Sequence, residues 1–146
     1  MLSESITRAA EAESSVWAAA LRADPDWEPV FSPLAPAALA LGLETVYEAY
    51  LVHYGRPRLF AAPDGDDAIL LGDYLYAHGL VHIAAAGGVP AVAAMADLIA
   101  RCAALRADGE GGDGEAWVDA ARALGGDPPD DAVVDALARH SARVAP

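Results

Sequence analysis

Two glutamates stand at a spacing that suits metal binding or acid–base chemistry. Glu44 and Glu48 are four residues apart, so on a helix their carboxylates would lie on one face. Such a pair can hold a divalent cation or exchange protons with a substrate. A solvated polar face is the alternative, although the apolar neighbours Leu41 and Leu51 indicate that this face could line a pocket. Glu44 and Glu48 are therefore the candidate metal ligands.

Two histidines, His78 and His82, share the same four-residue spacing, which can clamp a metal between two turns of a helix. No glutamate lies between them, so the zinc-protease motif is excluded. Asp73 precedes His78 by about one turn and could orient its ring. The alternative is a pair of histidines that only fill the protein interior, and we expect His140 to be such a packing residue.

Two arginines, Arg56 and Arg58, flank Pro57 in an otherwise acidic chain. Because proline stiffens the turn, both guanidinium groups could be held ready for a phosphate or carboxylate ligand. The alternative is that they pair with the nearby aspartates of residues 64–67.

The composition excludes several classes of chemistry. With 9 basic and 22 acidic residues the formal charge of the 146-residue chain is −13, which disfavours nucleic-acid binding. The chain contains no Lys, Asn or Gln, so Schiff-base chemistry, a P-loop and side-chain amides in an oxyanion hole are excluded. The lone cysteine, Cys102, cannot form an internal disulfide and is expected to be a buried small side chain.

The sequence predicts that the elements positioning these residues are all helices, because in no segment do apolar and polar residues alternate with the period of two that is typical of a strand. The pattern predicts one all-α domain of about six helices, divided into an N-terminal helix at 3–23, a proline-rich loop at 24–36 lying on the core, a helical core at 37–107 and C-terminal helices at 108–146. Two helices of the core, at about 67–86 and 90–107, are separated by Gly87-Gly88 and opened again by Pro90. Both are so apolar that we expect them at the centre of the bundle, buried on most faces.

Targeting signals are not predicted. The first residues are acidic and polar, unlike a signal peptide. The most apolar stretch, 83–96, is interrupted at 87–90 and is shorter than the roughly 20 residues of a membrane span. We therefore expect a cytoplasmic protein with no membrane span.

The segment 68–75, A-I-L-L-G-D-Y-L, resembles the A-V-L-x-G-D-x-L helix of the trans-isoprenyl diphosphate synthases, which build polyprenyl chains inside an all-α fold. The stretch 43–53 is similar to the helix that ends in L-I-H before the family's first aspartate-rich motif, and 55–57 to the R-R-G-x-P element after it. The resemblance covers about residues 40–107. It implies an isoprenoid or diphosphate ligand, with Arg56, Arg58, Tyr54, Asp73 and His78 as candidate ligand-binding residues.

The chain departs from this family at the residues that perform catalysis. In one alignment Glu44 and Glu48 replace two acids of the first aspartate-rich motif; in the other Tyr54-Gly55 stands where the paired aspartates belong. The second aspartate-rich motif is absent. Ionising a diphosphate needs a cluster of cations, which two glutamates cannot assemble. The resemblance is greatest to the short non-catalytic small subunit of heteromeric hexaprenyl and heptaprenyl diphosphate synthases.

The leading prediction is therefore a catalytically silent accessory or regulatory subunit without a cofactor. It would pair with a prenyl synthase catalytic subunit, or with itself, through the two Ala-rich central helices, and it would shape an isoprenoid pocket. Two alternatives stay open. One is a minimal Mg²⁺-dependent enzyme that processes prenyl diphosphates as a homodimer, and the other is a small-ligand-binding or structural helical homodimer.

Overall fold

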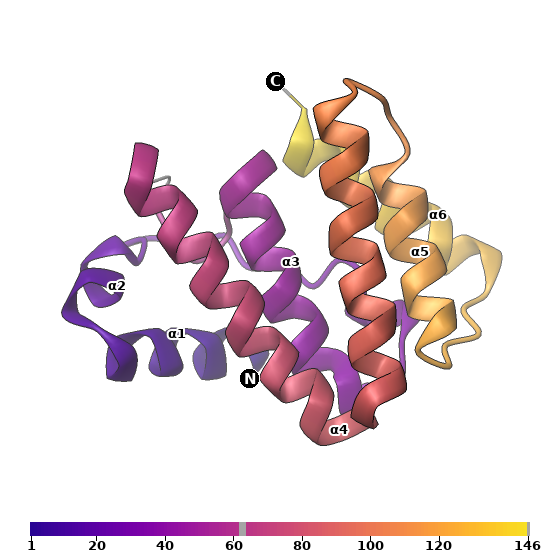
Figure 1. Cartoon of the computed structure of the whole chain (residues 1–146), viewed down its shortest axis with the longest axis horizontal. Coiled ribbons are helices and arrows are strands. Elements are labelled where there is room, and N and C mark those ends of the chain that lie inside the picture. Colours follow the sequence, from indigo (N-terminus) through magenta and orange to yellow (C-terminus); the bar gives the residue numbers. More distant parts are fainter. Residues whose placement is uncertain (62–63, 146) are drawn as a thin grey trace.

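The computed structural model describes residues 1–61 and 64–145, and this part of the chain is a single all-α domain (Figure 1). The predicted fold class is confirmed. The described residues form six α-helices: α1 (Leu2–Glu13), α2 (Ser15–Ala20), α3 (Ala40–Tyr54), α4 (Gly65–Ala107), α5 (Asp113–Ala123) and α6 (Asp130–Val144). Two short 3-10 helices, η1 (Ser32–Leu34) and η2 (Ala37–Leu39), lead into α3.

The predicted N-terminal helix is divided in two by Ser14. Its backbone is extended, with φ −162° and ψ 140°, which ends α1. The Ser14 hydroxyl then accepts a hydrogen bond from the backbone N–H of Val16 at 3.0 Å and so caps α2. Serine favours this position because its short side chain satisfies an N–H group that the helix itself leaves free.

The centre of the molecule is α3, not the two helices predicted there. Every residue from Gly42 to Leu51 is buried, since α1, α4, α6 and the two 3-10 helices all contact α3. The approach to α4 is close at Gly42 and Gly79: a methyl group added at Gly79 would lie 2.6 Å from the Val46 side chain. Glycine is needed at this crossing because any side chain would push the two helices apart.

The helix α4 consists of two arms that meet at an elbow, the lowest point of the molecule in Figure 1. Gly88 has φ +70° and ψ −164°, a conformation that side-chain-bearing residues rarely adopt. Pro90 follows in the first turn of the second arm, where its missing N–H costs no hydrogen bond. The predicted break at Gly87-Gly88 is thus confirmed.

The prediction that both arms are buried on most faces is wrong. The first arm packs on α3 through one side only, and residues on its other side are exposed, among them Leu70 at 57% and Val81 at 65%. At the elbow Val89 is 82% exposed. The physical reason is that the remaining helices pack around α3 and on the inner side of the second arm, so they cannot also cover the outer side of α4.

The core consists of two apolar clusters on opposite sides of α3. The larger lies between α3, α4, α5 and α6 and contains Phe31, which stacks on Trp117 with ring centres 5.4 Å apart. The smaller lies between α1, α3 and the first arm of α4, around Ile6 and Leu71. Phe31 belongs to the proline-rich loop, so the prediction that this loop lies on the core is confirmed. Cys102 is buried as predicted, and burial raises the pKa of its thiol to about 12.

Candidate functional site

The paired glutamates of α3 lie in the interior, where they bind loop backbone and a buried arginine. Glu44 is 0% exposed; its Oε2 accepts hydrogen bonds from the N–H groups of Val30 at 3.1 Å and Ser32 at 2.9 Å. Its Oε1 lies 2.5 Å from Nη1 of Arg58. Glu44 therefore attaches the loop before η1 to the central helix.

Glu48 does the same for the loop that follows α3. Its Oε2 accepts from the N–H groups of Arg58 at 2.9 Å and Leu59 at 2.8 Å, and its Oε1 accepts from Nε of Arg58 at 2.9 Å. The alternative of a solvated polar face is wrong, because both carboxylates are fully buried. A cation could reach these oxygens only by displacing the N–H donors they already bind.

Arg58 is the positive centre of this network, which we call the Arg58 cluster (Glu44, Glu48 and Arg58). Its guanidinium lies 4.2 Å from the ring centre of Trp27 and 5.1 Å from that of Tyr47, so aromatic rings contact it as well as the carboxylates. Burial alone would lower the pKa of Arg58, but the two carboxylates outweigh it and raise the pKa. The pairing partners are thus Glu44 and Glu48 rather than the aspartates of 64–67.

Arg56, the other predicted phosphate ligand, points the opposite way. Its guanidinium donates hydrogen bonds to the backbone carbonyls of Ala142 and, at 3.1 Å, Ala145, at the end of α6. A cation at this position satisfies free carbonyls and interacts favourably with the helix dipole. The structure therefore does not bring Arg56 and Arg58 together into one anion site.

The remaining predicted ligand residues lie along the contact between α3 and α4. Tyr54 is half-buried at the end of α3, with the guanidinium of Arg106 5.3 Å from its ring centre. Asp73 is largely exposed on α4, and its carboxylate lies 3.8 Å from Nε2 of His53. The structure does not gather Tyr54, Asp73 and Arg58 into one pocket.

The two histidines of α4 do lie together. His78 and His82 are half-buried, and their Nε2 atoms are 3.3 Å apart. Asp73 contacts His53 rather than orienting the His78 ring. What holds His78 is Tyr74, which stacks on it with ring centres 5.5 Å apart.

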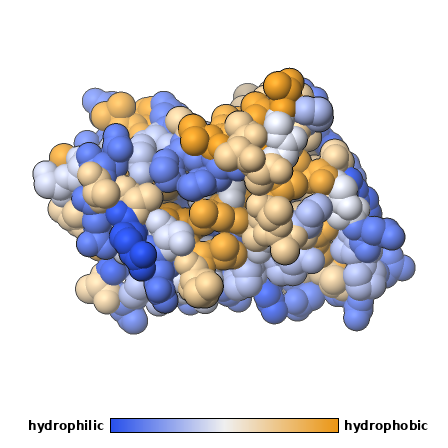
Figure 2. All heavy atoms as spheres, turned by 90° about the horizontal axis from the view of Figure 1, so that it is seen from below, coloured by the Kyte–Doolittle hydropathy of each residue, from blue (hydrophilic) through white to orange (hydrophobic). Residues whose placement is uncertain are grey.

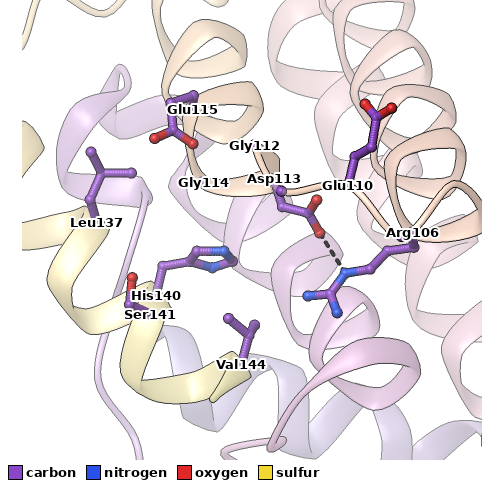
Figure 3. A pocket seen from close by; sticks show the side chains of 12 residues that line it. Arg106, Glu110, Gly112, Asp113, Gly114, Glu115, Leu137, His140, Ser141 and Val144 are labelled. Carbon is purple, nitrogen blue, oxygen red and sulfur yellow. Dashed lines mark hydrogen bonds and ion pairs between the residues drawn. The ribbon is translucent and has the colours of Figure 1, made fainter. Parts of the chain in front are cut away.

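A pocket of about 490 Å³ opens between the end of α4, the glycine-rich loop 109–112 and the helices α5 and α6 (Figure 3). Arg106 enters it from α4, and its Nε donates to Oδ2 of Asp113 at 2.8 Å. The hydroxyl of Tyr50 donates to the same carboxylate oxygen and accepts from Nη2 of Arg106 at 2.8 Å. Sequence reasoning missed Arg106 and Asp113, since no motif or helical spacing links them.

His140 lines this pocket from α6, with its Nδ1 2.8 Å from the hydroxyl of Tyr47. The pKa of His140 is lowered to about 4, chiefly by burial and to a smaller extent by Arg106, and the nearby carboxylates of Asp113 and Glu115 only partly offset this. The ring is therefore neutral near pH 7. His140 is buried as a packing residue would be, but it also belongs to a hydrogen-bonded network under a pocket.

Exposed apolar side chains are concentrated on α4. Four of the seven large hydrophobic side chains exposed in the described chain belong to it: Ile69, Leu70, Val81 and Val89. Leu70, Ala77, Val81 and Ala84 lie at helical spacing on the side turned away from α3, with the exposed Asp73 between Leu70 and Ala77. We call these four apolar residues the outer face. Seen from below, apolar residues gather near the centre and at the upper right of the molecular surface, with polar residues on both flanks (Figure 2).

The helix α4 is long and apolar enough to cross a membrane, but core helices of soluble proteins can have the same length and composition. Among residues 1–61 and 64–145, no three His, Cys, Asp or Glu side chains converge as a metal-binding group.

In comparisons with known proteins, no family model, no curated protein and no solved structure matches this chain.

Proposed function

We propose that this protein is a non-catalytic accessory subunit that binds a catalytic chain through the outer face of α4. The observation that carries the proposal is the exposure of Leu70 and Val81 on a helix that the rest of the chain covers on one side only. Exposed apolar side chains gathered on one side of a helix are typical of sites that another protein covers.

The distribution of charge supports the same conclusion. The chain carries a formal charge of −13, yet from Ile69 to Ala96 its only Asp, Glu, Lys or Arg residue is Asp73. The centres of protein interfaces are depleted of charge in this way. The first arm, from Gly65 to Gly87, is about 34 Å long at 1.5 Å per residue, which is enough for several turns of a partner helix to lie along it.

The Arg58 cluster supports the non-catalytic part of the proposal. An enzyme that used Glu44 and Glu48 to hold Mg²⁺ would need oxygens directed at a substrate, whereas these oxygens bind Arg58 and loop N–H groups. The same contacts explain why α3 carries two acids at that spacing. They connect the two loops that flank the helix.

The partner is proposed from the resemblance to the trans-isoprenyl diphosphate synthases at residues 68–75, with a polyprenyl synthase catalytic chain as the partner. Gly72 of this segment is buried against His53 of α3, while Asp73 is exposed beside the outer face. In this proposal the accessory chain shapes the pocket in which the partner elongates its product. The partner chain alone would catalyse the reaction.

The test is co-expression with the polyprenyl synthase chain of the same organism. We expect the two chains to purify as one complex, and Val81→Glu to weaken their binding at least tenfold, because a charge would be buried at the interface. The matched control is Val134→Glu on α6, since Val134 is 67% exposed and Val81 65%. Both variants should remain as stable as the wild type, within about 0.5 kcal/mol.

Three outcomes would overturn the proposal. The first is that no prenyl synthase chain is recovered, and the second is that Val81→Glu and Val134→Glu bind equally well. The third is that the purified chain forms a homodimer, or floats with phospholipid vesicles, and loses this behaviour in Val81→Glu. The outer face would then bind a second copy or a lipid surface instead.

A further inference from the structure

The histidine pair of α4 is held in a geometry suited to a metal ion. His78 and His82 lie one turn apart with their Nε2 atoms directed at each other, 3.3 Å apart. Zinc binds imidazole nitrogen at about 2.0–2.1 Å. Two nitrogens separated by 3.3 Å can both reach one zinc ion at that distance with an N–Zn–N angle of roughly 104–111°, which includes the tetrahedral value.

Aromatic neighbours fix the orientation of the rings before any metal binds. Trp17 of α2 stacks on Tyr74, with ring centres 5.9 Å apart, and Tyr74 stacks in turn on His78 at 5.5 Å and an interplanar angle of 19°. His82 then meets His78 edge to face, at 4.7 Å and 85°. A site whose ligands are already oriented loses less conformational entropy when it binds.

We propose that His78 and His82 form a two-histidine chelate for a divalent transition-metal ion of the zinc type. Each ring donates the lone pair of its Nε2, so both rings carry their proton on Nδ1, and the present contact between the two Nε2 atoms is replaced by two metal–nitrogen bonds. Water fills the remaining positions, because the described residues offer no third convergent ligand.

The surroundings favour this metal class over magnesium. Neutral imidazole is a ligand for zinc, copper and nickel, whereas magnesium prefers oxygen ligands. The chain's formal charge of −13 attracts cations to its surface from solution.

Isothermal titration of the untagged protein with ZnCl₂ tests the proposal without any partner chain. We expect one zinc ion per chain, and at least tenfold weaker binding in His78→Gln and in His82→Gln, because each variant leaves a single protein ligand. His53→Gln is the matched control. His53 is also half-buried and stacks on Tyr76, but it has no second histidine beside it and lies near the carboxylate of Asp73 instead. Its zinc affinity should equal that of the wild type, and MgCl₂ should give no heat of binding.

A second measurement on the wild type keeps the proposal testable should a glutamine variant unfold. In ¹⁵N spectra of the histidine side chains, zinc should shift the Nε2 signals of His78 and His82 and leave those of His53 and His140 in place. Equal zinc affinity of wild type and both glutamine variants would overturn the proposal, as would zinc shifts confined to other histidines. Failure to bind a prenyl synthase chain would not bear on it, since this site lies within one chain.

Discussion

Arg58 is the residue with the largest expected effect on stability, because two buried carboxylates depend on it. In Arg58→Met, Glu44 and Glu48 would both remain buried without a cation, since their side chains are 0% exposed. Removing one partner of a buried ion pair typically costs about 3–5 kcal/mol. We expect a loss of that size in the free energy of unfolding, measured by urea denaturation.

The control for this prediction is a surface ion pair. Arg101 and Asp119 are 3.0 Å apart, with side chains that are 50% and 58% exposed. Arg101→Met should cost less than about 1 kcal/mol, because water already screens the two charges. Equal losses in the two variants would contradict the role assigned to Arg58.

His140 makes the stability of the fold depend on pH. Burial lowers its pKa to about 4, whereas in the unfolded chain it takes the ordinary value of about 6.5. As the pH falls below 6.5 the unfolded state binds a proton that the folded state does not, so the folded state loses stability until about pH 4. Between pH 7 and 5 this contributes a loss of about 2 kcal/mol.

Unfolding experiments at several pH values isolate this contribution. His53 and His82 also have pKa values lowered chiefly by burial, so they act in the same direction. The share of His140 is therefore the difference between the wild type and His140→Gln, in which the stability should fall less on acidification. Parallel pH profiles for the two proteins would show that the His140 ring is not held neutral.

At the scale of elements, the elbow of α4 depends on one glycine. Gly88→Ala should destabilise the protein by about 1–3 kcal/mol, because the backbone at φ +70° and ψ −164° suits glycine alone. Gly111→Ala is the control: Gly111 has no positive φ, and a methyl group there would meet no atom within 4 Å. The measurement is the thermal unfolding midpoint, which should be lower for Gly88→Ala than for Gly111→Ala. Equal midpoints would mean that the elbow tolerates another conformation.

The whole molecule carries far more negative than positive charge, and mutual repulsion of its acids opposes folding. Raising NaCl from about 20 mM to 0.5 M shortens the Debye length to a few ångströms. We expect the unfolding midpoint to rise by about 2–4 °C, equivalent to roughly 1 kcal/mol for a chain of this size. KCl should act equally, and a midpoint that falls with salt would show that local ion pairs outweigh the net charge.

Features that depend on neighbours in the sequence could be predicted without the structure. The all-α class, the break at Gly87-Gly88 and the restart at Pro90 follow from periodicity and from backbone preferences of glycine and proline. The buried loop around Phe31 is indicated by the apolar side chains within it. The prediction for residues 3–23 missed the break at Ser14. Serine there caps a second helix, although the residues around it have good helix propensity.

What each side chain meets was decided only by the tertiary structure. The spacing of Glu44 and Glu48 correctly indicated a shared face, but the arginine and the loop N–H groups on that face come from segments 10–14 residues away. Likewise the apolar pattern of 67–107 predicted helices that avoid water, and the fold covers only one side of them. Periodicity shows which residues of a helix share an apolar face, but whether and by which segment that face is covered depends on contacts between distant parts of the chain.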